Sequence, residues 1–101
     1  MQMLVLTFRQ SLEQSVQDIL KDLKIKGFTQ MSNLSGLGQT GAVPSGFAWT
    51  GFNAMLFAAM EEDQITEAVD RFRAFCEEHT KQESEVKVPL RAFVMPCEQL
   101  L

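Results

Sequence analysis

The chain has 101 residues, of which 46% are hydrophobic and 22% charged, the composition of one globular domain. Its formal net charge is −4, so it lacks the dense cationic footprint that nucleic-acid phosphates require. No apolar run is long enough to span a membrane, and the start, MQMLVLTF, lacks the positive region and cleavage site of a signal peptide. We therefore expect a single cytoplasmic domain over residues 1–101, with Cys76 and Cys97 reduced.

The first third of the chain predicts a strand, a helix and a second strand. The apolar run Met3–Phe8 is typical of a strand. Ser11 and Gln14 have the spacing of a capping box, which predicts a helix start. One apolar helical face follows, made of Leu12, Val16, Ile19, Leu20 and Leu23. Gly27 is expected to end this helix in the left-handed conformation, and residues 28–34 alternate weakly, as a strand does.

Residues 35–53, SGLGQTGAVPSGFAWTGFN, predict a long uncharged hairpin loop that contains five glycines. Loops longer than about 12 to 15 residues are usually functional or disordered. Three bulky aromatic residues, Phe47, Trp49 and Phe52, crowd the second half of this loop. They either fold back onto the sheet edge or a neighbouring subunit, or they form an exposed surface that docks a partner. The residues alone leave both interpretations open.

The second half of the chain predicts a strand, a helix and a last strand. Residues Asn53–Met60 are apolar on both faces and are expected to form a strand, after which Glu61, Glu62 and Asp63 favour a helix start. This helix is expected to end near His79. Its apolar stripe is Ile65, Ala68, Val69, Phe72, Phe75 and Cys76. The last strand is expected near Leu90–Met95, after Pro89.

The predicted order is strand, helix, strand, strand, helix, strand, which is an α+β fold. It predicts a ferredoxin-like βαββαβ sandwich, in which two helices lie on one face of a four-stranded antiparallel sheet. The strands are apolar on both faces, although the helices can cover only one. Leaving several large apolar side chains in water would forfeit on the order of 10 kcal/mol. Because the chain offers no spare element, we expect a homo-oligomer to bury the other face.

Four stretches stand in one order along the chain: LEQSVQDILKDLKIKGFT, SGLGQTG, EEDQITEAVDRF and RAFVMPCEQL. They resemble the first helix with the turn after it, the start of the T-loop, the second helix and the last strand of the PII nitrogen regulatory and PII-like signalling proteins. The resemblance spans most of the chain. It implies a homotrimer with ligand clefts between subunits, and it makes residues 35–53 a shortened T-loop-like hairpin that reaches a target protein.

The resemblance also implies a set of ligand-binding residues. These are Gly36, Gly38, Gln39, Gly41 and Arg91. Backbone N–H groups at the glycines can approach an anion closely. Arg91 stands where the family has a lysine that contacts nucleotide phosphates, and a guanidinium can take that role. Through the 36–52 loop, with Phe47, Trp49 and Phe52, the resemblance implies docking to a partner such as a transporter or an enzyme.

The sequence departs from the family where the phosphates would bind. A glycine–aspartate–glycine motif is replaced by ESEVKVPL, in which Glu83 and Glu85 would repel a polyphosphate. An adenine nucleotide is therefore a disfavoured alternative to another small effector, and no cofactor is assigned. We expect a non-enzymatic PII-like regulator that senses a small effector at subunit clefts and signals through residues 36–52.

Two other functions are left as alternatives. A CutA-like trimer would bind a divalent metal through His79, Cys76 or Cys97, although a lone histidine at a helix end is more typical of a structural role. A dimeric α/β-barrel enzyme would enclose a cavity lined by Trp49 or Phe57. The sequence contains no HExxH motif and no nucleophile with a nearby histidine. It therefore gives little support for catalysis, and we assign no catalytic residue.

Overall fold

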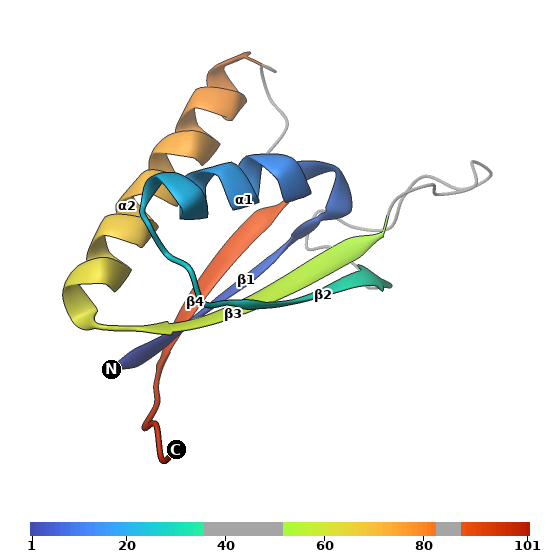
Figure 1. Cartoon of the computed structure of the whole chain (residues 1–101). Coiled ribbons are helices and arrows are strands. Elements are labelled where there is room, and N and C mark those ends of the chain that lie inside the picture. Colours follow the sequence, from blue (N-terminus) through green and yellow to red (C-terminus); the bar gives the residue numbers. More distant parts are fainter. Residues whose placement is uncertain (36–51, 83–87) are drawn as a thin grey trace.

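The structure, a computed structural model, describes residues 1–35, 52–82 and 88–101, apart from the side chains of residues 80–82. It contains one sheet with helices on one face (Figure 1). The elements in chain order are β1 (Gln2–Arg9), the 3-10 helix η1 (Gln10–Leu12), α1 (Glu13–Asp22), β2 (Thr29–Leu34), β3 (Asn53–Met60), α2 (Glu62–Gln82) and β4 (Leu90–Pro96). Every predicted strand and helix is present.

The four strands lie in the order β2-β3-β1-β4, and all neighbouring pairs are antiparallel. Figure 1 shows α1 and α2 on the same face of the sheet, and the described part of the chain places no helix on the other face. The predicted ferredoxin-like sandwich is therefore confirmed. No helix among the described residues is long and apolar enough to cross a bilayer.

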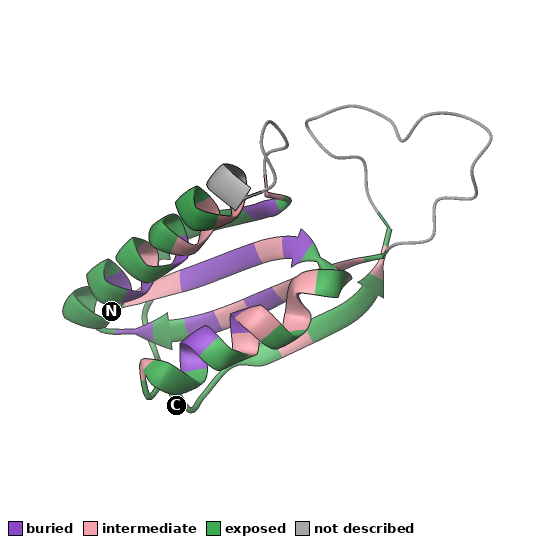
Figure 2. Ribbon diagram, turned by 90° about the horizontal axis from the view of Figure 1, so that it is seen from above, coloured by how far each residue is buried: buried purple, intermediate pink, exposed green. Residues whose placement is uncertain are grey.

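The hydrophobic core lies between the sheet and the two helices. Alternate residues of β1, namely Leu4, Leu6 and Phe8, point toward the helices, as the two-residue period of a strand requires. The core also takes Val16, Ile19 and Leu20 from α1, and Ile65, Ala68 and Phe72 from α2. Figure 2 shows buried residues along the strands and at intervals along the helices. The predicted apolar stripes are thus confirmed.

Strand β2 differs from the other strands because none of its residues belongs to this core. Its helix-facing side chains are polar and form hydrogen bonds with α1. Gln17 Nε2 donates to Gln30 Oε1 over 3.1 Å, and Ser32 Oγ donates to the Glu13 carboxylate over 3.3 Å. Gln30 Nε2 donates to the same carboxylate. β2 is thus attached by its ladder with β3 and by polar contacts to α1.

The start of α1 corrects the predicted capping box. The chain leaves β1 through a 3-10 turn, so Ser11 lies inside that turn, and the residue that precedes the helix is Leu12, without a side-chain cap. An N-cap side chain acts from extended backbone directly before the helix, and Ser11 does not hold that position. Gln14 donates to Asp18 instead, over 2.9 Å.

The end of α1 corrects the role predicted for Gly27. The helix ends at Asp22, and Lys24, with φ of 61°, adopts the left-handed conformation. Lys24 N–H donates to the carbonyl of Lys21, and Ile25 N–H donates to the carbonyl of Leu20, each over 2.9 Å. This pair of bonds is a Schellman motif. Ile25 is buried, so the chain must turn before it, three residues earlier than Gly27.

Helix α2 agrees with the prediction at its start and is longer at its end. Glu62 and Asp63 lie in the first turn, where carboxylates interact favourably with the positive end of the helix dipole. The helix continues past His79 to Gln82. β4 begins directly after Pro89, whose carbonyl accepts a hydrogen bond from the N–H of Arg9 over 3.0 Å.

Candidate functional site

One face of the sheet points away from both helices, and its register assembles an apolar surface. Val5 of β1 lies opposite Phe57 of β3 and Phe93 of β4, and Met3 lies opposite Met95. Met55 lies opposite Met31 of β2. We call this surface the open face and define it by its seven apolar residues: Met3, Val5, Met31, Met55, Phe57, Phe93 and Met95.

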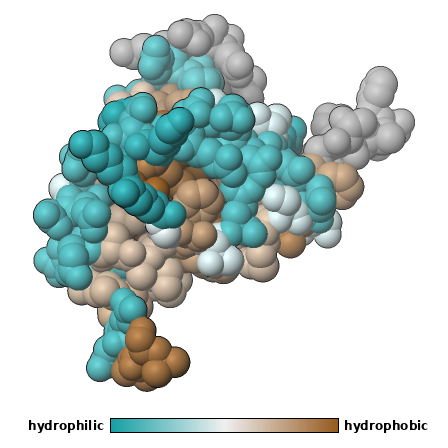
Figure 3. Space-filling view, in the orientation of Figure 1, coloured by the Kyte–Doolittle hydropathy of each residue, from teal (hydrophilic) through white to brown (hydrophobic). Residues whose placement is uncertain are grey.

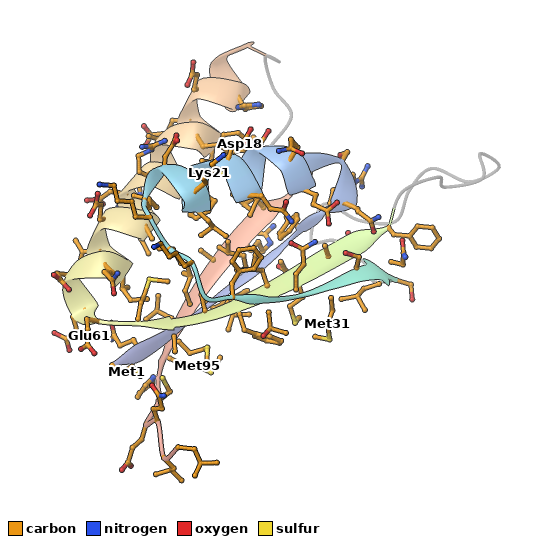
Figure 4. All side chains as sticks on the ribbon, in the orientation of Figure 1. Met1, Asp18, Lys21, Met31, Glu61 and Met95 are labelled. Atoms are coloured by element: carbon orange, nitrogen blue, oxygen red, sulfur yellow. The ribbon has the colours of Figure 1, made fainter. Side chains whose placement is uncertain are left out.

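The side chains of the open face are most exposed to solvent on the two edge strands, β2 and β4. Phe93 is 51% exposed, Met95 47% and Met31 41%, whereas Val5 at the centre is only 7% exposed. Figure 4 shows Met31 and Met95 on the side of the sheet opposite Asp18 and Lys21 of α1. In Figure 3 hydrophilic side chains cover the outer surface of the helices. The end of the chain projects from the rest of the molecule in the same view, and its residue Leu100 is exposed. The prediction that the sheet is apolar on both faces is confirmed.

The positively charged side chains of this face gather at one end of it. Arg91 of β4 lies opposite Thr7 of β1, and the alternation of β1 places Arg9, two residues further on, on the same face. Diagonal neighbours of this kind have Cα atoms about 7–8 Å apart, within reach of two long side chains. Arg91 is exposed and forms no ion pair with any described residue. The pair of arginines is suited to binding an anion.

The same end of the sheet carries both ends of the predicted hairpin loop. Leu34, the last residue of β2, pairs with Asn53, the first residue of β3, and Asn53 also lies opposite Arg9. Arg9 and Arg91 are therefore neighbours of the loop base. Sequence reasoning selected Arg91 and missed Arg9, because only the register of β1 against β4 brings the two arginines together.

Most of the predicted site residues lie outside the described residues. They are Gly36, Gly38, Gln39, Gly41, Phe47 and Trp49, and the glutamates Glu83 and Glu85 are outside as well. Phe52 is described: it precedes β3 directly, and its side chain is 49% exposed. Its carbonyl accepts a hydrogen bond from the N–H of Gln10 over 2.7 Å. The side-chain Oε1 of Gln10 accepts the N–H of Asn33 over 2.8 Å, at the other end of the loop.

The residues of the metal-binding alternative lie on α2 and after β4. His79 Nδ1 donates to the carbonyl of Phe75 over 3.2 Å, and the two rings lie in contact, with centroids 4.0 Å apart and planes tilted by 38°. Burial, and to a lesser degree the carboxylate of Glu77, raises the pKa of the Cys76 thiol, which disfavours the thiolate that would bind a metal. Among the described residues, no group of three or more His, Cys, Asp and Glu side chains is placed to hold a metal ion.

Comparison with known proteins supports the architecture. No protein-family model and no curated protein sequence matches the chain. CPII, a nitrogen regulatory PII-like protein from Thiomonas intermedia, has a solved structure bound to ADP, AMP and bicarbonate. It is 22% identical, with a TM-score of 0.64 over 93% of this chain and 88% of that chain. Its apo form is also 22% identical, with a TM-score of 0.65 over 92% and 84% of the two chains.

A provisionally assigned PII-like signalling protein from Thermus thermophilus is also similar in structure. It is 18% identical and has a TM-score of 0.58 over 92% of this chain and 82% of that chain. At these identities the likeness shows the fold. The PII-like architecture that the four sequence stretches predict is therefore confirmed.

Proposed function

Since the chain has the fold of the PII-like proteins, we propose that it is a non-enzymatic sensor that assembles as a homotrimer and binds a small anionic effector between subunits. In this proposal residues 36–52 carry the response to a partner protein, such as a transporter or an enzyme, in the cytoplasm. The observation that carries the proposal is the open face, which brings together seven apolar residues and has Arg9 and Arg91 at its loop end.

The apolar part of the open face supports assembly. Phe93, Met95 and Met31 are each about half exposed in the single chain, and covering each would contribute on the order of 1 kcal/mol. In a symmetric assembly, a second and a third copy of the chain would cover this surface. Such a surface on a lone chain would instead favour uncontrolled association.

The charged end of the open face supports anion binding at the assembly. A guanidinium that becomes partly buried between subunits needs a counter-charge, because an unpaired buried charge is costly. Arg91 has no negatively charged partner among the described residues, so the effector is expected to supply the negative charge. Phosphate and carboxylate groups match the planar donors of arginine. ADP, AMP and bicarbonate, which the solved structures of CPII hold, are therefore the first effectors to test.

The test is a titration of the purified chain, at constant ionic strength, with ADP, AMP, bicarbonate and divalent metals. Binding is measured by calorimetry and by the fluorescence of Trp49, the single tryptophan, and the mass of the assembly by light scattering. Arg91→Gln is compared with Arg73→Gln, which removes an exposed α2 arginine that pairs only with Asp70 of its own helix. We expect a trimer whose affinity for the anion falls roughly 10- to 100-fold in Arg91→Gln and stays unchanged in Arg73→Gln.

Other outcomes would each contradict part of the proposal. Equal anion affinity in Arg91→Gln and the wild type would remove Arg91 from the site. A trimer that binds metal and no anion would favour the CutA-like alternative. A dimer with an enclosed apolar cavity would favour the α/β-barrel enzyme.

A further inference from the structure

We propose that Gln10 is a positioning residue that fastens both ends of the hairpin loop to η1, the turn that precedes α1. Its backbone N–H donates to the carbonyl of Phe52, directly before β3, over 2.7 Å. Its side-chain Oε1 accepts the N–H of Asn33, one residue before the end of β2, over 2.8 Å. One residue of η1 thus contacts the chain just before the loop and just after it.

The strand ladder is irregular where Gln10 binds. Met31 pairs with Met55, but the next pair is Leu34 with Asn53, so the register shifts between them. Asn33 lies within this shift and has φ of 59°. Residues in such a bulge do not pair regularly with the neighbouring strand. The amide of Asn33 is turned instead toward the side chain of Gln10, which replaces the missing ladder contact.

Gln10 matters more here because β2 has little else to hold it on the helix side. No β2 residue belongs to the hydrophobic core, and the remaining contacts of its helix-facing side chains are hydrogen bonds to Glu13 and Gln17. A segment with few buried apolar contacts opens locally at a lower free energy than the core strands. The polar contacts from η1 and α1 are therefore expected to set how firmly the end of β2 is held.

Gln10 then links the position of the loop ends to η1, the turn that precedes α1. A displacement of Asn33 or Phe52 when an effector binds would be resisted by η1 or transmitted to it. This use in signalling rests on the proposed function, whereas the fastening itself is a property of the described fold. The test therefore uses the full chain without any ligand.

The experiment measures backbone amide hydrogen exchange by NMR in the wild type and in three variants. Gln10→Ala removes the acceptor of the Asn33 N–H, and Gln10→Glu retains an acceptor oxygen. Gln14→Ala is the matched control, because the hydrogen bond that the Gln14 side chain makes to a described residue goes to Asp18, within α1. We expect the exchange rate of the Asn33 amide to rise about two- to tenfold in Gln10→Ala. It is expected to stay at the wild-type value in Gln14→Ala and to return toward that value in Gln10→Glu.

Either of two results would overturn the proposal. An unchanged rate at Asn33 in Gln10→Ala would mean that the side chain does not hold this amide. An equal rise at the slow amides of β1, such as Leu4 and Leu6, would mean that the substitution lowers global stability and does not loosen the loop ends. Neither result depends on an effector, so the proposed function would stand or fall separately.

Discussion

Backbone conformation at single residues decides where the elements end. Lys24 and Asn33 both have positive φ, 61° and 59° respectively, in a region that disfavours residues with a Cβ atom. Asparagine tolerates this region because its short side chain bonds locally, whereas lysine has no such compensation. Lys24 is retained there because the Schellman turn directs Ile25 into the core.

Replacing Lys24 by glycine is expected to stabilise the fold. Glycine relieves about 1–2 kcal/mol of left-handed strain and costs about 0.5–1 kcal/mol of added freedom in the unfolded chain. The free energy of unfolding should rise by up to about 1.5 kcal/mol, measured by urea denaturation. Lys26→Gly is the control: Lys26 is exposed, lies two residues away and has no positive φ, so this change should give no gain. A loss of stability in Lys24→Gly would contradict the strain argument.

Residue-level reasoning from the sequence placed the end of the first helix at the wrong residue and missed one arginine of the open face. Gly27 is the residue that most easily adopts positive φ, but composition cannot show that burial of Ile25 forces the turn earlier. Arg91 was selected through the family resemblance. Its neighbour Arg9 was missed because the two arginines meet only when the register of β1 and β4 is known.

At the scale of elements, the sequence predicted both α-helices and all four strands, and the signal was clearest where the apolar residues follow a regular period. Leu4, Leu6 and Phe8 repeat every second residue, and Val16, Ile19 and Leu20 repeat at helical spacing. The boundary of α1 was predicted wrongly, because a 3-10 turn fills the space between β1 and the helix and places Ser11 inside it. Predictions for residues 36–51, including the glycines of the ligand site, stay predictions.

The 3-10 turn gives a test of the helix boundary. Ser11 is exposed and its side chain forms no hydrogen bond to a described residue, so Ser11→Ala should change the free energy of unfolding by less than about 0.5 kcal/mol. Removing a true N-cap would cost about 1 kcal/mol. Thermal and urea unfolding of Ser11→Ala and of Ser15→Ala, a serine inside α1, provide the comparison. A loss near the N-cap value confined to Ser11→Ala would restore the capping box.

At the scale of the whole molecule, the sequence predicted that the sheet has more apolar surface than two helices can cover. The structure identifies that surface as the open face, with the most exposed side chains on the edge strands β2 and β4. The number of subunits could not be predicted from apolar pattern, because the hydrophobic effect has no preferred direction. In the proposed function that number comes from the PII-like fold, and it is open to direct measurement.

Phe93→Asp provides the sharpest test of how the open face is used. Phe93 is 51% exposed in the single chain, so a carboxylate at this position should leave the fold of the subunit intact. In an assembly the same carboxylate would be buried against apolar side chains of another copy, at a cost of several kcal/mol. Ala74→Asp introduces the same group on the exposed side of α2 and serves as the control. Light scattering should therefore show a smaller assembly for Phe93→Asp and the wild-type mass for Ala74→Asp, with unchanged circular dichroism in both. If both variants keep the wild-type mass, the subunits associate through some surface other than the open face, and the anion site proposed at Arg9 and Arg91 would then face solvent.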